Sequence, residues 1–187
     1  MTKFISLDFE YADVILPSIC SISIVQWNDN KIENVYYQLI NPECEIEEFL
    51  CDRHGITNNF VKNAPNIREI WKDIYDMIDG QLVVTHYAKR NIDALKKLTS
   101  INYLNLPSFQ YICTASMCRR LYGYLKTDRL YEITAYLDIA DKHFNAKEDA
   151  ISVGKLFIQG MEDTGSSDIQ SFVEDYKIVH GKFQIVH

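Results

Sequence analysis

The sequence predicts an α/β protein with a mixed sheet, in which three antiparallel strands are followed by parallel strands and helices flank the sheet. Two patterns predict this fold: apolar and polar residues alternate within residues 3–40, and helical and strand-like segments alternate beyond them. The chain has 187 residues, of which 47% are hydrophobic. A chain of this length and composition suits one compact domain with its own core.

The first third of the chain should form three strands. Lys3–Glu10 and Cys20–Trp27 alternate apolar with polar residues, and Ile32–Ile40 is rich in β-branched and aromatic residues. The polar turn Asn28–Asn30 joins the second segment to the third. Strands joined by a short turn pair antiparallel, so we expect a meander at the start of the sheet.

Helices and short strands alternate in the rest of the chain. We expect an acidic loop over Glu43–Glu48, and a helix that Asn66 caps and that continues to Ile78. The other expected elements are helices over Ile92–Leu98, Thr114–Leu121, Leu130–Leu137, Ala146–Met161 and Asp168–Tyr176, and strands over Leu82–Thr85, Phe109–Cys113 and Phe183–Val186. Residues 1–162 should form the main domain, and residues 163–187 a C-terminal extension that packs on it or extends it.

Composition and charge narrow the possible functions. No apolar run approaches the roughly 18 residues that a membrane-spanning helix needs, and the N-terminus lacks the uncharged stretch of a signal peptide. The five cysteines include no CxxC pair. These features predict a cytoplasmic protein that does not act in a membrane. The net charge is −7, yet residues 81–130 carry eight basic and two acidic side chains, which form either a track for phosphates or a solvated surface.

Asp8 and Glu10 lie at the end of the first expected strand. Residues i and i+2 of a strand point to the same side, so the two carboxylates should lie side by side. Like charges held together repel one another unless a cation lies between them, and Mg²⁺ and Mn²⁺ favour such oxygen ligands. The pair is therefore either a metal site or an exposed strand end with two solvated acids.

Several short segments, taken in order, resemble the DEDD superfamily of 3′–5′ exonucleases and in particular its DEDDh branch. The segments are Phe4–Ala12 (FISLDFEYA), Cys20–Val25, Ile40–Pro42, His54–Thr57 (HGIT), Leu82–Ala88 (LVVTHYA), Cys113-Thr114 and Leu137–Ala150. The resemblance implies an RNase H-like fold and a site where four carboxylates hold two divalent ions, Mg²⁺ or Mn²⁺. It also implies a histidine as general base and the release of mononucleotides from 3′ ends.

Three carboxylates match this resemblance. Asp8 and Glu10 match its first motif and Asp149 its last, so the resemblance implies that all three are catalytic metal ligands. Asn91 stands where the second motif has an aspartate, and an amide keeps one acceptor oxygen but loses the negative charge. Asp93 follows two residues later and should face away from Asn91 on a helix.

The general-base position also departs from the resemblance. Phe144 stands there and cannot accept a proton, whereas the neighbouring His143 would serve as a substitute base only after a local shift of the chain. Loss of the base removes about 10²–10⁴ in rate. With Asn91 and Phe144 both changed, we expect hydrolysis to be weak or lost, while the three matching carboxylates are still able to hold one ion.

Six residues near the expected site are candidates for substrate binding. Tyr11 is bulkier than the threonine that the family often has there, and the alternative for His86 is a buried structural histidine. The six candidates are Phe9, Tyr11, His86, Tyr87, Lys89 and Arg90.

Two functional hypotheses remain from the sequence. The first is an exonuclease-family protein that acts on or binds the 3′ ends of single-stranded DNA or RNA, or short oligonucleotides, with little or no hydrolysis. The alternative is a catalytically inactive module on the same fold that binds nucleic acid or a protein. The choice between DNA and RNA, a protein partner and a homodimer all stay open.

Overall fold

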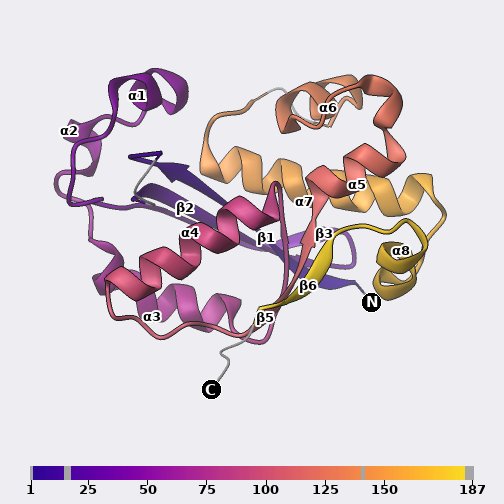
Figure 1. Cartoon of the computed structure of the whole chain (residues 1–187), viewed down its shortest axis with the longest axis horizontal. Coiled ribbons are helices and arrows are strands. Elements are labelled where there is room, and N and C mark those ends of the chain that lie inside the picture. The colour runs from indigo at the N-terminus through magenta and orange to yellow at the C-terminus, as the bar shows by residue number, and fades with distance from the viewer. Residues whose placement is uncertain (1, 15–17, 140–141, 184–187) are drawn as a thin grey trace.

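A six-stranded mixed sheet forms the centre of the molecule in the computed structural model, which describes residues 2–14, 18–139 and 142–183 (Figure 1). The strands are β1 (Lys3–Tyr11), β2 (Ile19–Asn28), β3 (Lys31–Leu39), β4 (Leu82–Thr85), β5 (Phe109–Cys113) and β6 (His180–Phe183). They lie in the order β3-β2-β1-β4-β5-β6. β1, β2 and β3 pair antiparallel, whereas β1, β4 and β5 pair parallel, which confirms the predicted mixed sheet.

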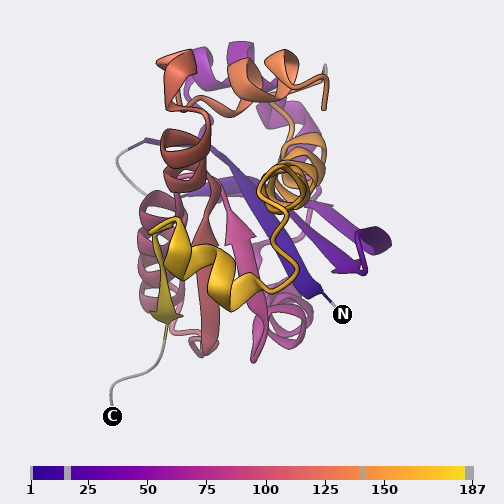
Figure 2. The ribbon, with the colours of Figure 1, turned by 90° about the vertical axis from the view of Figure 1, so that its right-hand side faces the viewer.

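Helices cover both faces of this sheet, and Figure 2 shows α7 nearly end-on at one side and α4 at the other. The helices are α1 (Glu48–His54), α2 (Asn58–Val61), α3 (Ile67–Ile78), α4 (Ala88–Ile101), α5 (Thr114–Leu121), the 3-10 helix η1 (Gly123–Leu125), α6 (Leu130–Tyr136), α7 (Ala146–Asp163) and α8 (Ile169–Asp175). Within the described residues, none of them combines the length and the apolar character that crossing a membrane requires.

Three α-helices differ from the sequence prediction. α1 begins at the last residue of the expected acidic loop, and α1 and α2 were not predicted. α4 begins at Ala88, earlier than the expected Ile92, because Tyr87 adopts a left-handed conformation with a φ of 52° and its carbonyl accepts from the backbone N–H of Arg90 over 2.8 Å. The earlier start places Arg90 and Asn91 in the first turn of the helix.

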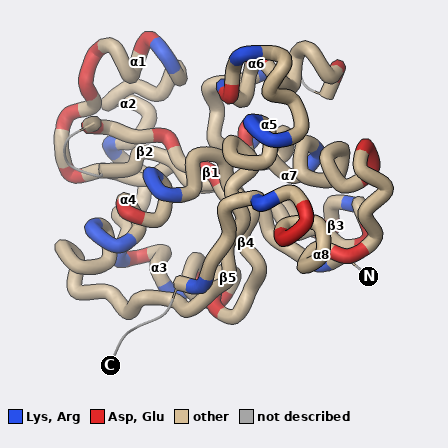
Figure 3. The backbone as a smooth tube through the Cα atoms, turned by 45° about the vertical axis from the view of Figure 1, so that its right-hand side comes forward, with Lys and Arg blue, Asp and Glu red and all other residues tan. Residues whose placement is uncertain are grey.

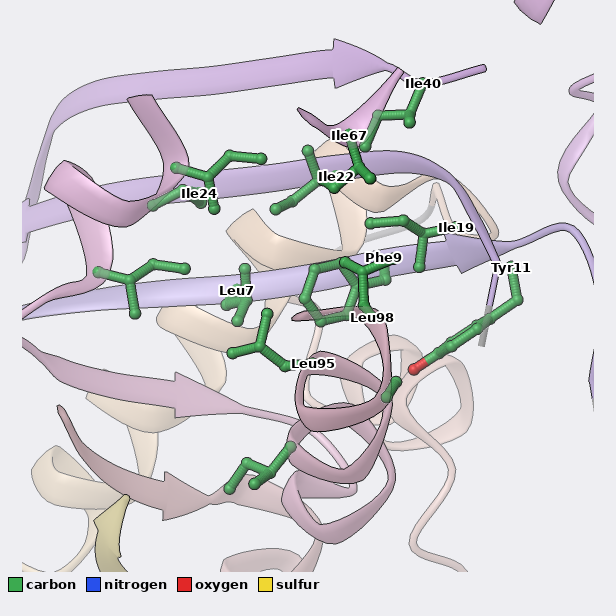
Figure 4. Packing of buried hydrophobic residues seen from close by; sticks show 14 of the residues in the cluster. Leu7, Phe9, Tyr11, Ile19, Ile22, Ile24, Ile40, Ile67, Leu95 and Leu98 are labelled. Atoms are coloured by element: carbon green, nitrogen blue, oxygen red, sulfur yellow. The ribbon is translucent and has the colours of Figure 1, made fainter. Parts of the chain in front are cut away.

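Side chains alternate between the two faces of β1. Leu7 and Phe9 point toward α3 and α4, where they belong to one buried cluster with Leu98 of α4 (Figure 4). The opposite face of the sheet is covered by α5, α7 and α8. Because residues of a strand alternate, Asp8 and Glu10 lie on the α7 side of the sheet.

Gly154 allows α7 to lie close to the sheet. A Cβ atom at this position would lie 2.3 Å from the ring of Trp27 in β2, so a larger residue would force the helix and the strand apart. Trp27 is held in turn by β1, because its Nε1 donates a hydrogen bond to Ser6 Oγ over 2.8 Å. This close contact places the first turn of α7, and with it Asp149, beside the end of β1.

The segment after residue 162 adds one helix and one strand to the fold. Phe172 of α8 is fully buried and packs against Phe157 of α7, with 5.9 Å between the ring centroids. β6 pairs antiparallel with β5. It begins at His180, three residues before the expected strand Phe183–Val186, and residues 184–186 of that expected strand lie outside the described residues.

Candidate active site

Three carboxylates meet where β1 ends and α7 begins. Asp8 and Glu10 come from β1, and Asp149 comes from the first turn of α7. One ligand oxygen from each of the three lies within 4.8 Å of the others. We call Asp8, Glu10 and Asp149 the carboxylate trio.

Burial and mutual repulsion destabilise the ionised forms of the trio. Burial raises the pKa of Asp8 well above its usual range, and the charges of Asp149 and Glu10 raise it further. Burial, followed by repulsion from Asp149, raises the pKa of Glu10 to about 7. The pKa of Asp149 is also raised by burial. A divalent cation among the three carboxylates would remove the repulsion, and the donor set is all oxygen, so the trio fits Mg²⁺ or Mn²⁺.

The chain just before α7 binds both oxygens of Asp149. His143 Nδ1 lies 2.8 Å from Asp149 Oδ1 and is the donor, because a carboxylate only accepts. The backbone N–H of Phe144 donates to Oδ2 over 3.0 Å. His143 Nε2 lies 2.9 Å from Thr134 Oγ1. Nδ1 is therefore taken by Asp149, and Nε2, the nitrogen that would accept a proton, is directed at Thr134 in this arrangement. The role of His143 as a substitute base stays a hypothesis.

Asn91 is buried and hydrogen-bonded through both ends of its amide. Its Oδ1 accepts from the Tyr11 hydroxyl over 2.9 Å. Its Nδ2 donates to Thr85 Oγ1 over 2.6 Å and to the His86 carbonyl over 3.2 Å. A carboxylate cannot donate the last two hydrogen bonds, so the surrounding structure fits an amide and not an aspartate at this position.

The carboxylate trio, His143, Phe144, Asn91 and Tyr11 line a cleft of about 610 Å³. The cleft lies at the carboxyl ends of β1 and β4, with residues of α1 and α6 on its two sides (Figure 1). Ligands of α/β sheets commonly bind at the carboxyl ends of the strands. Four aromatic side chains also line the cleft, namely Tyr11, Tyr87, Tyr131 and Phe144.

Two arginines of the cleft are held on aromatic rings. The guanidinium carbon of Arg90 lies 4.5 Å from the centroid of the Tyr11 ring, and that of Arg53 lies 5.3 Å from the centroid of the Phe144 ring. An aromatic ring orients a guanidinium without neutralising its charge. Both arginines therefore keep their positive charge beside the carboxylate trio.

Other cations near the cleft are paired with carboxylates. Arg129 lines the cleft, whereas Lys89 does not and projects from the exposed side of α4. Figure 3 shows Lys and Arg positions on α1, α4 and α5. The ion pairs are Lys89–Asp93, Arg119–Asp128 and Arg129–Glu132. Asp93 thus lies outside the cleft and does not take the place of a carboxylate at Asn91.

The remaining predicted substrate-binding residues have different surroundings. Phe9 is among the residues that line the cleft, but it is only 4% exposed and its side chain packs in the core (Figure 4). Tyr87 is 39% exposed and lines the cleft. His86 also lines the cleft, but its Nδ1 and Nε2 lie 2.9 Å from Thr114 Oγ1 and 2.7 Å from the Asp128 carbonyl. Burial lowers the pKa of His86 to about 4, so the ring is neutral near pH 7.

The sequence matches the family model of the RNase T exonucleases over residues 5–157. The chain belongs to this exonuclease family. The match begins inside β1 and ends inside α7, so it includes the complete carboxylate trio. It confirms the family resemblance that the short sequence motifs indicate.

Curated relatives of this exonuclease domain are much longer proteins. DNA polymerase III PolC-type from Caldanaerobacter subterraneus subsp. tengcongensis is 26% identical over 175 residues, which cover 92% of this chain and 12% of that protein. The 3′-5′ exonuclease DinG from Staphylococcus saprophyticus subsp. saprophyticus is 25% identical over 162 residues, which cover 84% of this chain and 18% of that protein. The chain thus spans less than a fifth of either relative.

Solved exonuclease structures share the fold. Exonuclease X in complex with 5′-overhanging duplex DNA superposes with a TM-score of 0.73 at 20% identity, covering 92% of this chain and 99% of that one. The nuclease domain of 3′hExo, a DEDDh family member bound to rAMP, superposes with a TM-score of 0.74 at 17% identity, covering 86% of this chain and 92% of that one. The predicted RNase H-like fold is therefore confirmed.

Three charged or aromatic lining residues of the cleft were not predicted from the sequence: Arg53, Arg129 and Tyr131. One signal was available for Arg53, which directly precedes the segment His54–Thr57 that the resemblance includes. Gly55 of that segment ends α1 in a left-handed conformation with a φ of 73°, so the segment fixes the end of the helix that carries Arg53. No pattern in the sequence points to the other two.

Proposed function

We propose that this exonuclease-family chain binds the 3′ ends of single-stranded DNA or RNA, or short oligonucleotides, in the cleft around the carboxylate trio, with Mg²⁺ or Mn²⁺ as the ion. We propose further that hydrolysis is weak or lost. The observation that carries the proposal is the convergence of one buried and two half-buried carboxylates, two arginines held on aromatic rings, and further exposed rings in one cleft.

The chemistry of the cleft wall supports nucleic acid as the ligand. Guanidinium groups bind phosphates, and aromatic rings stack with bases of any sequence. Tyr87 and Tyr131 are 39% and 37% exposed and both line the cleft, so part of each ring is accessible there. Two similar structures also have a DNA duplex and a nucleotide bound to those proteins.

The groups around the scissile position support weak or absent hydrolysis. A bound divalent ion supplies positive charge at a phosphodiester and lowers the pKa of a bound water. The chain itself would have to remove a proton from that water. Phe144 has no group that accepts a proton, and both nitrogens of His143 are engaged by Asp149 and Thr134. Asn91 adds no negative charge for a further ion.

The test combines end binding with an assay for cleavage. A fluorescent linear 12-mer, as DNA and as RNA, is titrated with the protein at low salt in Mn²⁺ and separately in EDTA, and a circular single-stranded DNA of similar length is the competitor without ends. The same 12-mers, labelled at the 5′ end, are incubated with excess protein. The Asp8→Ala variant is run beside the wild type to exclude a contaminating nuclease.

We expect binding that needs Mn²⁺, favours linear over circular DNA and is lost in Asp8→Ala, together with little or no shortening of the 12-mer. Rapid shortening that Asp8→Ala abolishes would overturn weak hydrolysis, and would make the chain an active 3′–5′ exonuclease. Absence of binding at low salt would overturn the nucleic-acid proposal, because phosphate contacts strengthen as salt falls. The inactive module that binds a protein would then be favoured. A cytoplasmic location remains a prediction.

A further inference from the structure

Arg53 and Arg90 reach the carboxylate trio from two separate elements. Arg53 comes from α1 and Arg90 from the first turn of α4. Each guanidinium lies over an aromatic ring, Phe144 for Arg53 and Tyr11 for Arg90. Both arginines line the same cleft as the trio.

The rings beneath the arginines are themselves fixed by the residues of the site. The Tyr11 hydroxyl donates to Asn91, which neighbours Arg90 in the same helical turn. Phe144 donates its backbone N–H to Asp149 and has a φ of 61°, an uncommon left-handed conformation for a bulky residue. Each arginine therefore lies on a ring whose residue is hydrogen-bonded to another residue of the site.

The two arginines act electrostatically on the trio. The guanidinium groups of Arg53 and Arg90 share one cleft with the three carboxylates, where burial limits the screening of charges by water. Neither arginine has a carboxylate within ion-pair distance among the described residues. Their charges are thus directed at the trio and at whatever enters the cleft.

We infer that the trio holds a single divalent ion and that Arg53 and Arg90 supply the positive charge that a second ion would bring to a bound phosphodiester. This inference rests on the proposed function. One divalent ion and two guanidinium groups exceed three ionised carboxylates by one positive charge, which one phosphodiester group compensates. A second divalent ion would bring two further charges, and Asn91 contributes no charge to balance them.

The inference is tested by counting bound ions. Mn²⁺ is titrated into the wild type at pH 8, with and without the oligonucleotide dT4, and free Mn²⁺ is measured by electron paramagnetic resonance. We expect one bound Mn²⁺ in both conditions. The variants Arg53→Gln and Arg90→Gln are titrated in the same way, and dT4 binding is measured for each. Arg120→Gln, which changes an exposed arginine of α5 outside the cleft, is the matched control.

The two arginine variants should change the two affinities in opposite directions. Removing a positive charge beside the trio should tighten Mn²⁺ binding roughly three- to tenfold and weaken dT4 binding by a similar factor. Arg120→Gln should change neither by more than about twofold. Circular dichroism spectra check that each variant is folded.

The outcomes separate this inference from the proposed function. Two bound Mn²⁺ in the wild type, together with dT4 binding, would overturn the inference alone. Weaker binding of both Mn²⁺ and dT4 in a folded arginine variant would also overturn it, because a merely structural role predicts that result. One bound Mn²⁺ without any dT4 binding would overturn the proposed function, and with it the role of the arginines toward a phosphodiester.

Discussion

The two walls of the cleft differ in whether their polar groups have partners within the protein. The β1–α7 wall (Asp8, Glu10 and Asp149) holds three carboxylates whose charges repel one another. The α4 wall (Tyr11 and Asn91) makes a closed set of contacts, in which the amide and the hydroxyl each have a hydrogen-bond partner. The polar groups of the α4 wall have partners without a ligand. The negative charges of the β1–α7 wall are balanced only when a cation binds.

This difference shows which wall gains free energy when a ligand binds. Buried charges without a counter-ion reduce the stability of the free protein and are relieved by a bound cation. Satisfied hydrogen bonds give rigidity but leave little to gain from a ligand. The β1–α7 wall should therefore respond most to metal and to pH, and the α4 wall should respond most to changes in its own shape.

Replacing Glu10 should give the largest effect, and it should show how much the β1–α7 wall reduces the free energy of unfolding. The pKa of Glu10 is raised from its ordinary value of 4.5 to about 7, so its ionisation destabilises the metal-free fold by up to about 3 kcal/mol. Between these two values the folded protein keeps a proton that the unfolded chain has released, so wild-type stability falls as the pH rises from 4.5 to 7. Glu10→Gln should be more stable than the wild type at pH 8, and the difference should vanish near pH 4.5.

Urea denaturation in EDTA at pH 4.5, 6 and 8 measures this difference, and comparison with the wild type at each pH cancels the titration of other groups. Glu45→Gln changes an exposed glutamate and is the matched control. If Glu10→Gln were no more stable than the wild type at pH 8, the carboxylates of this wall would not destabilise the free protein. In 10 mM Mn²⁺ the order should reverse, because the variant lacks one ligand.

Replacing Asn91 tests whether the α4 wall requires an amide. Asn91→Asp keeps the shape but removes the two donated hydrogen bonds to Thr85 and to the His86 carbonyl. It should reduce the free energy of unfolding by about 2 kcal/mol, because buried acceptors lose their donors and face a carboxylate. Urea denaturation at pH 8 checks this, with the exposed Asn63→Asp as control. An unchanged midpoint would mean that this wall accommodates a carboxylate and that its amide is incidental.

The sequence predicts the β1–α7 wall much better than the α4 wall. The alternation in β1 is a local rule that directs Asp8 and Glu10 to one side, and the family resemblance indicates Asp149, which lies in the first turn of the predicted helix α7. The α4 wall depends on the Tyr11–Asn91 hydrogen bond, which joins residues 80 positions apart. No local pattern in the sequence predicts such a contact. No local pattern predicts the left-handed conformation of Tyr87, which starts α4 early, either.

Replacing His143 should loosen Asp149 within the β1–α7 wall. His143 donates to Asp149 Oδ1 over 2.8 Å and thereby orients the carboxylate. His143→Ala should weaken Mn²⁺ binding about tenfold, since partners of metal ligands typically contribute a factor of this size. Titration of Mn²⁺ followed by electron paramagnetic resonance measures the affinity, with His180→Ala, an exposed histidine of β6, as control. Unchanged affinity would favour the role of His143 as a base over a positioning role.

The smallest expected change separates the two contacts that Tyr11 makes in the α4 wall. Tyr11→Phe removes the hydroxyl that donates to Asn91 but keeps the ring beneath Arg90. Stability should fall by about 1 kcal/mol, because Asn91 Oδ1 loses its donor. Tyr103→Phe is the matched control, since Tyr103 is 97% exposed.

Oligonucleotide affinity of Tyr11→Phe should change by less than about twofold, because the ring that orients the Arg90 guanidinium is kept. A large loss of oligonucleotide binding without a loss of stability would show that the hydroxyl itself contacts nucleic acid. The α4 wall would then be no closed set of contacts, and both walls of the cleft would hold polar groups that only a ligand satisfies.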